Sequence, residues 1–496
     1  MSIDPAGASA PRRSITKWLI LIVASIGFLF DTYELLMLPV IAGPALSELL
    51  QVPQNNPQVR DWVGRLLWMA ALSGGVFGLL GGWLIDRLGR KTVMAASIIV
   101  YSVSPLLAAF STELWEFVLF RCITFIGVCV QFVAAITWLA ELFPEKRSRE
   151  LAIGWTQAFA SVGGLLVTGA YRLSQEFGGQ LPALPVSEPF NAHAAWRYAL
   201  ITGLIPGLLI ALLLPFVPES RVWLEKKRSG TLKRPRFAEL FAPGLIRTTL
   251  VTTVLSACAY AAAFGALQLT PSQVVPGLPE FAENRQALEP LRKEANALNL
   301  KLNKTAPGSE ERKSLSKEVL ANRKKQLPYD EPIQKKGTTA QFWQETGGLA
   351  GRVLLAILVV AVASRRLLLW LFQVPGLLLF PLTYFYLFRD QPDYFLYGVF
   401  LCGLVTVAQF SYLGEYLPRA FPVHLRGTGG SFATNVGGRM IGTSAAFLTS
   451  NLIAPLLPVE QPFQVAVAAA IVGGGVYLIG LIASFWLPEP KPSAES

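Results

Sequence analysis

The sequence predicts an all-α membrane protein in which 12 transmembrane helices form two pseudo-symmetric six-helix bundles, with an extracytoplasmic helical hairpin as an insertion. Three observations predict this class. The 496 residues are 52% hydrophobic and 15% charged, whereas soluble proteins carry about 25% charged residues. Apolar runs long enough to cross a bilayer recur along the chain. The two halves also repeat one motif order. This composition disfavours a soluble enzyme and excludes a disordered chain.

The net charge of +11 does not indicate a nucleic-acid partner, because the basic residues gather in short clusters between apolar runs. Such clusters mark the cytoplasmic connections of membrane proteins. They follow the even-numbered spans as RLGRK, EKRSR, RVWLEKKRSGTLKRPR, SRR and PRAFPVHLR. We therefore expect a multi-pass protein of the plasma membrane with both termini in the cytoplasm.

Crossing about 30 Å of hydrocarbon takes about 20 apolar helical residues. The eighth candidate span, GGLAGRVLLAILVVAVAS, is short and contains Arg352. Twelve candidate spans are found, at residues 17–44, 62–85, 92–110, 115–140, 150–172, 197–216, 245–268, 345–364, 366–388, 393–417, 427–453 and 463–487.

These spans divide the chain into five parts. They are a cytoplasmic tail (1–16), an N-terminal six-helix bundle (17–216), a cytoplasmic linker (217–244), a C-terminal six-helix bundle (245–487) and a cytoplasmic tail (488–496).

Residues 269–344 form a polar insertion between the seventh and eighth spans. PEFAENRQALEPLRKEANALNLKLNK and SEERKSLSKEVLANRKKQL favour helices, and APGS between them favours a turn. We expect an extracytoplasmic helical hairpin, because long loops escape the charge rule. It is either a solvated spacer or a lid or binding surface for a protein partner.

The two halves echo each other. AELFPEKRSRE follows the fourth span and GEYLPRAFPVHLRG follows the tenth, and both place Pro and then Arg after Glu. A six-plus-six repeat is a transporter architecture with its substrate site near the bilayer midplane, between the halves.

The stretch GWLIDRLGRK at residues 82–91 follows the second span. It resembles the signature loop of the major facilitator superfamily. Gly82 would allow close approach of a neighbouring helix, and Gly89 would permit the turn. Asp86 can pair with an arginine or cap a neighbouring helix, which would close the cytoplasmic side.

Further motifs are similar to those of the sugar-transporter-like members. They are RCITFIG (121–127), Trp196-Arg197, and PESRVWL (218–224). The resemblance implies a cytoplasmic gate formed by Gly82, Asp86, Arg87, Gly89, Arg90, Glu141, Arg149, Glu219, Arg221, Glu415 and Arg426. The loop after the eighth span has Ala361, Ser364, Arg365 and Arg366 where Asp, Gly, Arg and Arg would be expected, so the gate is predicted to be asymmetric.

Two branches of this group differ in their motifs. Sugar porters carry Gln-Gln in the seventh span and Gly-Pro-Trp in the tenth, and this chain has neither. The pattern FDTYE at 30–34 and VGGR at 436–439 resembles the organic-anion:proton symporters of the aromatic-acid and sialate type. Glu34 stands where those proteins more usually have Asp. This resemblance implies proton-coupled symport of a small carboxylate.

Ionisable groups inside spans indicate function by default. At 1.5 Å per residue, Asp31, Arg121, Arg352 and Arg439 all lie about 18–22 Å from the inner face. Glu34 lies one turn from Asp31 on roughly the same face. We expect Asp31 and Glu34 to carry the coupling proton, and Arg121, Arg352 and Arg439 to bind the substrate anion.

Two carboxylates facing three guanidinium groups leave one positive charge unpaired, and an unpaired buried charge is costly. A monovalent organic anion would supply the missing partner. The alternative is that some of these pairs are static locks between helices.

Other polar side chains within the spans are candidates for lining a cavity, although each alone is also consistent with helix packing. Gln131 and Gln409 are the best of them, because they lie deep in corresponding spans. The full set is Tyr33, Gln131, Trp138, Gln157, Tyr260, Gln409, Tyr412 and Asn435.

No nucleotide-binding motif is present, so coupling is expected to use an ion or substrate gradient. Four cysteines inside apolar runs and two distant histidines indicate no metal site, and no cofactor is expected. We expect a monomer that is not an enzyme. The alternative functions are a sugar or other neutral-solute facilitator or symporter, a multidrug:proton antiporter, and a non-transporting receptor that uses the 269–344 hairpin.

Overall fold

The computed structural model describes residues 10–51, 57–143, 145–186, 190–231, 236–305, 309–459 and 463–489. Within these ranges the chain is helical and contains no β-strand. Helices are the expected result, because the backbone of an apolar span must satisfy its hydrogen bonds internally in a bilayer. The predicted all-α membrane fold is therefore present.

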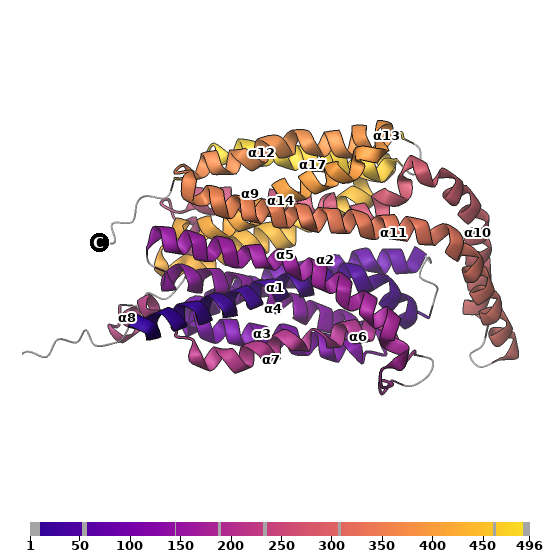
Figure 1. The fold of residues 1–496 in the computed structure, drawn as a ribbon, viewed down its shortest axis with the longest axis horizontal. Helices are drawn as coiled ribbons and strands as arrows, with labels where there is room; N and C mark the ends of the chain where they lie inside the picture. The colour runs from indigo at the N-terminus through magenta and orange to yellow at the C-terminus, as the bar shows by residue number, and fades with distance from the viewer. Residues whose placement is uncertain are drawn as a thin grey trace, which may run out of the picture.

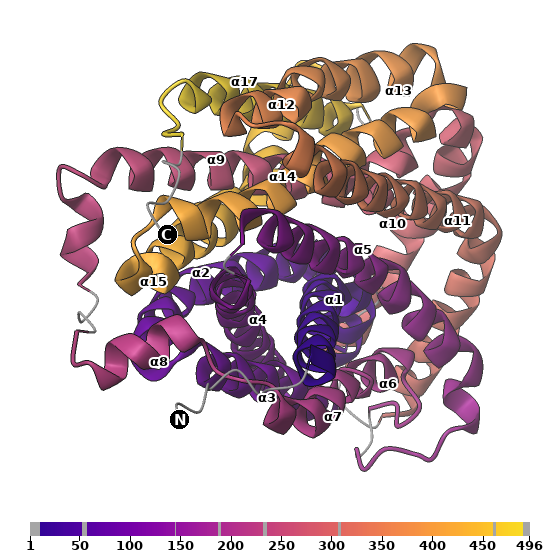
Figure 2. The same cartoon turned by 60° about the vertical axis from the view of Figure 1, so that its left-hand side comes forward.

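The helices form two groups that lie side by side (Figures 1 and 2). Each group has its own buried apolar core. The N-terminal group, indigo to magenta, consists of α1 (Ala10–Leu49), α2 (Pro57–Leu88), α3 (Arg90–Ala109), α4 (Leu114–Leu142), α5 (Lys146–Phe177), α6 (Ala195–Ile201) and α7 (Leu204–Leu213).

The short helix α8 (Arg221–Arg228) lies in the linker between the groups. The C-terminal group consists of α9 (Ile246–Gly265), α10 (Ala282–Lys304), α11 (Glu310–Ala361), α12 (Arg365–Pro381), α13 (Phe388–Asp390), α14 (Phe395–Ala420), α15 (Arg426–Ser431), α16 (Ala445–Phe447) and α17 (Gln464–Ser484).

Among the described residues, ten helical segments are long and apolar enough to cross a membrane. The sequence predicts twelve, and the difference lies in two interrupted spans. The sixth is divided at Thr202 and Gly203 between α6 and α7. The eleventh begins as α15 and continues through the π-helical segment Phe432–Gly442, α16 and a second π-helical run, Leu448–Ile453.

The predicted insertion contains two helices that pack against each other at the end of the molecule opposite α8 (Figure 1). Arg292 of α10 pairs with Asp330 of α11 at 2.9 Å, and Asn322 donates to Glu294 at 2.8 Å. Helix α11 then continues without a break to Ala361, so the expected boundary between insertion and span at residues 344 and 345 is absent. Residues 306–308 of the expected APGS turn lie outside the described ranges.

The two groups meet along two seams. On one, α2 packs against α15 and the π-helical segment; on the other, α5 packs against α11 and α14. Small residues bring α5 and α11 close together, because a Cβ at Gly154 would lie 3.1 Å from the Cβ of Ala356. These seams place charged residues of one group against the other.

Candidate functional site

Six buried charged residues, which we call the central cluster, gather at the seams between the two groups and, for Glu34 and Arg121, in the adjacent interior of the N-terminal group. Asp31 and Glu34 come from α1 and Arg121 from α4 in the N-terminal group. Glu345 and Arg352 come from α11, and Arg439 from the π-helical segment, in the C-terminal group. None is more than 9% exposed. Charges this deeply buried are costly unless they are paired, which marks the cluster as the strongest candidate for function.

Asp31 joins the two groups. Its Oδ2 lies 3.5 Å from Nη2 of Arg439, and its Oδ1 has no hydrogen-bond partner in the part of the chain that the structure describes. Arg439 also donates to Oδ1 of Asn435 at 3.3 Å and lies over the ring of Phe132, 5.4 Å from its centroid. Arg439 Nε has no hydrogen-bond partner. Both groups of this pair therefore keep hydrogen-bonding capacity for a further ligand.

Glu34 and Arg121 form a second pair within the N-terminal group. Their charged atoms lie 3.6 Å apart, and Arg121 also donates to the backbone oxygen of Glu34 at 3.2 Å. Neither carboxylate oxygen of Glu34 accepts a hydrogen bond from any described residue. The carboxylate instead fills the space left by the absent side chain of Gly203, where the sixth span is interrupted.

Arg352 donates to the backbone oxygen of Gln157 in α5 at 2.6 Å, which ties the two groups together along the second seam. Its charge interacts with those of Asp31 and Glu345. Glu345 accepts a hydrogen bond from Nε2 of Gln344 at 3.1 Å.

The predicted excess of one positive charge is wrong, because Glu345 is a third buried carboxylate of the cluster. It stands at the first residue of the predicted eighth span, where a carboxylate would face water. In the structure α11 extends well beyond that point, and Glu345 is buried. Three carboxylates therefore balance three guanidinium groups.

The predicted lining residues divide into two sets. Gln131 and Gln157 are buried, and among the described residues no amide atom of either side chain has a hydrogen-bond partner. Tyr260 interacts electrostatically with Arg439 and Arg352 and lies 4.7 Å from Phe410 between ring centroids. Asn435 holds Arg439, as described above.

The remaining predicted lining residues bind other parts of the protein. Tyr33 bonds Thr202 through their hydroxyl groups at 2.5 Å. Trp138 donates to the backbone oxygen of Pro218 at 3.1 Å, and Gln409 donates to that of Val405 at 3.2 Å. Tyr412 stacks on Tyr416. The Tyr33 and Trp138 contacts join different parts of the fold, whereas those of Gln409 and Tyr412 lie within α14 itself.

A second set of charges, which we call the end network, closes the α2–α3 end of the molecule. Asp86 accepts hydrogen bonds from the backbone N–H groups of Gly427 and Thr428, at 3.1 and 2.8 Å. It thereby caps α15 across the seam with a negative charge. Arg90 pairs with Glu141 at 3.0 Å, and Glu141 also lies 3.6 Å from Arg426.

The C-terminal half of the end network uses different residues, so the predicted asymmetry is visible in the contacts. Arg365 of α12 pairs with Glu150 of α5, and Arg419 lies 3.2 Å from the same carboxylate. Glu415 pairs with Arg365, at 3.4 Å, and with Arg419. Ala361, which replaces the expected Asp, takes no part in these pairs.

The other predicted gate residues have varied positions. A Cβ at Gly82 would lie 2.6 Å from the backbone oxygen of Gly427, which explains the close contact there. Gly89 separates α2 from α3 with a φ of 111°, a backbone conformation that favours glycine.

Other predicted gate arginines lie nearer the surface. Arg87 is exposed and lies over the ring of Trp83, Arg221 is exposed, and Arg149 is half-buried beside the end network. Pro144, part of the repeated motif, lies outside the described residues.

Two equivalent carboxylates hold the loops at this end. Glu219 accepts a hydrogen bond from the backbone N–H of Lys91 at 3.1 Å, at the start of α3. Glu489 accepts from the N–H groups of Arg365 and Arg366 at 3.0 and 3.1 Å, at the start of α12. Burial would raise the pKa of Glu489, but these bonds and that from Ser364 hold it below its usual value.

Four charged residues of these sites are not among those predicted from the sequence: Glu150, Glu345, Arg419 and Glu489. Pro488-Glu489 repeats Pro218-Glu219 after the last span of each half, and that repeat is a signal for Glu489. Glu150 and Arg419 carry no comparable signal, because their role depends on which helices meet across the seam.

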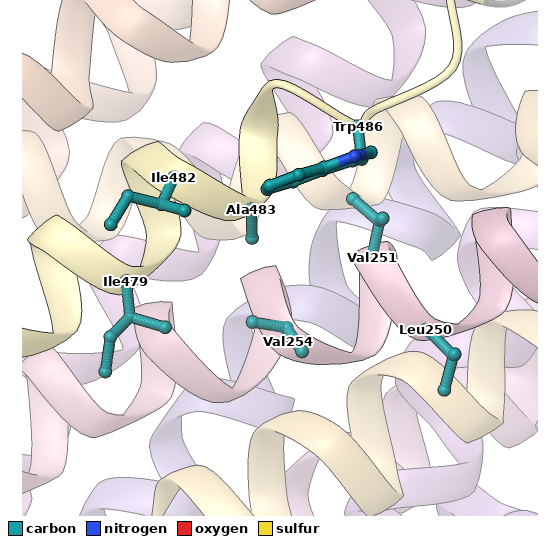
Figure 3. Close-up of a pocket in the computed structure, with 7 residues that line it drawn as sticks. All are labelled: Leu250, Val251, Val254, Ile479, Ile482, Ala483 and Trp486. Atoms are coloured by element: carbon teal, nitrogen blue, oxygen red, sulfur yellow. The ribbon is translucent and has the colours of Figure 1, made fainter.

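An apolar groove of about 300 Å³ lies between α9 and α17 (Figure 3). It is lined by Leu250, Val251, Val254, Ile479, Ile482, Ala483 and Trp486. Most of these side chains are exposed, and none is charged. We assign the groove to the lipid-facing surface, away from the central cluster. In the described part of the chain no group of three or more metal-ligating side chains occurs.

Comparisons with known proteins give one family. The model of the Major Facilitator Superfamily matches residues 18–288. The cis,cis-muconate transport protein of Acinetobacter baylyi is 22% identical over 84% of this chain and 82% of its own length. The 4-hydroxybenzoate transporter PcaK of Pseudomonas putida is 30% identical over 36% of each chain.

The fold is similar to that of the proton:xylose symporter XylE bound to 6-bromo-6-deoxy-D-glucose. The TM-score is 0.66 at 17% identity, over 96% of this chain and 97% of that one. The predicted resemblance to organic-anion transporters of this superfamily is confirmed by the relatives, and the fold by the structure.

Proposed function

The chain belongs to the major facilitator superfamily, and we propose that it takes up a small organic anion together with protons by alternating access. Members of this superfamily are multi-pass membrane transporters of small molecules and not enzymes, so the chain is a transporter. The organic anion, the proton and the direction of transport are the proposed parts.

The observation that carries the proposal is the balanced central cluster at the seam. Three carboxylates and three guanidinium groups are buried there without excess charge. A substrate carboxylate entering this cluster would leave one negative charge uncompensated, which is costly in a buried site. Protonation of one resident carboxylate restores the balance. Electrostatics therefore favours the entry of one proton with each monovalent anion.

Asp31 is the best candidate for that proton. It interacts with Arg439 and with Arg352, and both arginines belong to the opposite group. A substrate carboxylate can bind an arginine through two parallel hydrogen bonds and thereby compete with Asp31. Once displaced from its cations, Asp31 is a buried carboxylate that takes a proton more readily. Gln131 and Gln157 offer unpartnered amides for the rest of the substrate.

The end network supplies the gate. Its pairs join Asp86 to α15, and Arg365 to Glu150, across both seams. We assign this end to the cytoplasm from the basic loops, which puts both termini in the cytoplasm and the α10–α11 hairpin outside. The described conformation then has its cytoplasmic side closed, and transport requires these pairs to separate. The host membrane is proposed to be the plasma membrane.

The relatives support an anion more than a sugar. The muconate and 4-hydroxybenzoate transporters are named for carboxylates. The likeness to the xylose symporter supports the fold, but at 17% identity it does not select a sugar. The six charges also disfavour a multidrug:proton antiporter, which would need an aromatic cavity with one unpaired acid.

Uptake into proteoliposomes tests the proposal. Purified protein is reconstituted, an inward proton gradient is imposed, and uptake is measured for monocarboxylates, aromatic acids, sialic acid and hexoses. Gradient-driven accumulation of a carboxylate, abolished by a protonophore, is the expected result. Accumulation of a hexose with no response to carboxylates would overturn it.

A further inference from the structure

Glu345 lies on the second seam, and in the mechanism above it contributes a negative charge but takes up no proton. It lies on α11 against Gly164 of α5, where a Cβ would come within 2.7 Å of its Oε2. Only glycine leaves room for the carboxylate at that point. Amide groups of Gln344 and Gln268 also bind it. The missing side chain at Gly164 of α5 therefore provides the space that this carboxylate occupies.

Arg352 is the charged group that acts on Glu345. The two residues are seven positions apart on α11, which places them on one face about 10 Å apart along the axis. The neighbouring elements present uncharged groups to Glu345: Gly164 from α5, Leu36 of α1 beside it, and Gln268 after α9. The charge on Glu345 therefore determines how much of the positive charge on Arg352 is already compensated.

In this part of the cluster, negative and positive residues interact in alternation. Glu345 acts on Arg352, Arg352 acts on Asp31, and Asp31 pairs with Arg439. Two arginines of the C-terminal group thus flank one aspartate of the N-terminal group. When Asp31 alone is protonated, Arg439 loses its carboxylate partner, whereas Arg352 remains compensated by Glu345. When Glu345 is protonated as well, Arg352 also becomes available to an anion.

We propose that Glu345 is a second proton-binding carboxylate, and that its protonation makes Arg352 a second anion subsite for organic dianions such as dicarboxylates. This inference rests on the proposed function. A dianion brings two negative charges into a balanced cluster, and protons on Asp31 and Glu345 compensate both. A monovalent anion needs only the proton on Asp31. The transporter therefore takes two protons with a dicarboxylate and one with a monocarboxylate.

Counting protons per substrate in proteoliposomes tests the inference. The probes are cis,cis-muconate, a dicarboxylate, and 4-hydroxybenzoate, a monocarboxylate, with proton entry and radiolabel uptake measured together. In the wild type we expect ratios of two and one. Glu345→Gln leaves the cluster with one fixed positive charge, so it should lower the muconate ratio from two to one and the 4-hydroxybenzoate ratio from one to zero. The control is Glu331→Gln, which removes an exposed carboxylate from the same helix and should keep both wild-type ratios.

A second variant distinguishes the loss of a proton-binding group from a folding defect. Gly164→Ala crowds the carboxylate but leaves it titratable, so it should slow muconate uptake at least tenfold relative to 4-hydroxybenzoate uptake. A muconate ratio of two in Glu345→Gln overturns the inference, as does a wild type that takes muconate with one proton or not at all. Equal loss of both substrates in both variants makes Glu345 structural and also overturns it. If the wild type moves neither anion with protons, the proposed function itself fails.

Discussion

Arg439 of the π-helical segment lies 3.5 Å from Asp31 of α1, and this pair bridges the two helix groups at the centre of the molecule. The contact is buried, yet one oxygen of Asp31 and the Nε of Arg439 lack hydrogen-bond partners within the described ranges. A pair held this loosely can be opened by a competing carboxylate. It therefore links substrate binding, protonation and the contact between the halves.

Replacing Asp31 with Asn should separate proton coupling from substrate exchange. Asn cannot take the coupling proton, and the cluster then carries one fixed positive charge that accepts an anion directly. Gradient-driven uptake should fall at least tenfold, while exchange of labelled for unlabelled substrate continues. The control is Asp393→Asn, an exposed position before α14. If the Asp31 variant still accumulates substrate against a gradient, Asp31 is not the coupling group.

Replacing Arg439 with Lys should weaken substrate binding although the charge is kept. Lysine cannot form two parallel hydrogen bonds with a carboxylate, and it cannot keep both the Asn435 and Asp31 contacts. We expect the Kd for the substrate to rise at least tenfold, measured by the shift of thermal unfolding with substrate concentration. Unchanged affinity in a folded variant would mean that Arg439 is a structural lock.

Asp86→Asn should favour opening of the end-network side. The neutral amide is a weaker cap for the N–H groups of Gly427 and Thr428, and it no longer pairs with Arg90. Spin labels at exposed Arg87 and Ala363, in a variant without the native cysteines, report the separation of the two groups at this end. The distance distribution should shift to longer values. Arg221→Gln, on exposed α8, should leave it unchanged; a matching shift there would show that Asp86 has no special role.

Ten of the twelve predicted spans correspond to long apolar helices among the described residues, because hydropathy indicates a membrane span directly. The gate motif at 82–91 also predicted the contacts of Asp86 and the turn at Gly89. Glu345 was not predictable as a buried charge, since its burial depends on α11 continuing through the membrane surface as one helix. Glu150 was missed for a related reason, because its partner Arg365 lies 215 residues away across a seam. A local stretch of sequence indicates which residues share one face of a helix, but it does not indicate how two packed helices align with each other.

Glu489→Gln should lower the stability of the folded protein and make that stability less sensitive to acid. The carboxylate binds the first N–H groups of α12, and its pKa lies below the usual value. A carboxylate of this kind contributes stability at neutral pH, and that contribution is lost as the pH falls through the carboxyl range near about 4. We expect a loss of about 1 kcal/mol at neutral pH, measured by thermal unfolding in detergent. If the variant loses the same stability at neutral pH and at pH 3.5, the negative charge of Glu489 is not what stabilises the protein.

Shortening the α10–α11 hairpin should leave transport intact. Because the side chains of Arg292 and Asp330 form an ion pair between α10 and α11, with Nη2 and Oδ1 2.9 Å apart, residues 293–329 can be replaced by a Gly-Ser link that joins the two anchored ends. Uptake at matched reconstitution density should stay within twofold of the wild type. Loss of flux in a folded protein would make the hairpin part of the transport machinery, as a lid would be.

Proton movement induced by substrate in proteoliposomes tests the central claim most directly. A pH-sensitive dye is trapped inside, carboxylates or hexoses are added outside, and no proton gradient is imposed at the start. The account predicts acidification of the interior when a transported carboxylate is added to the wild type, none with hexoses, and none when a monocarboxylate is added to the Asp31→Asn variant. Uptake of a hexose without proton movement would contradict the account and would make the buried charges static locks between helices.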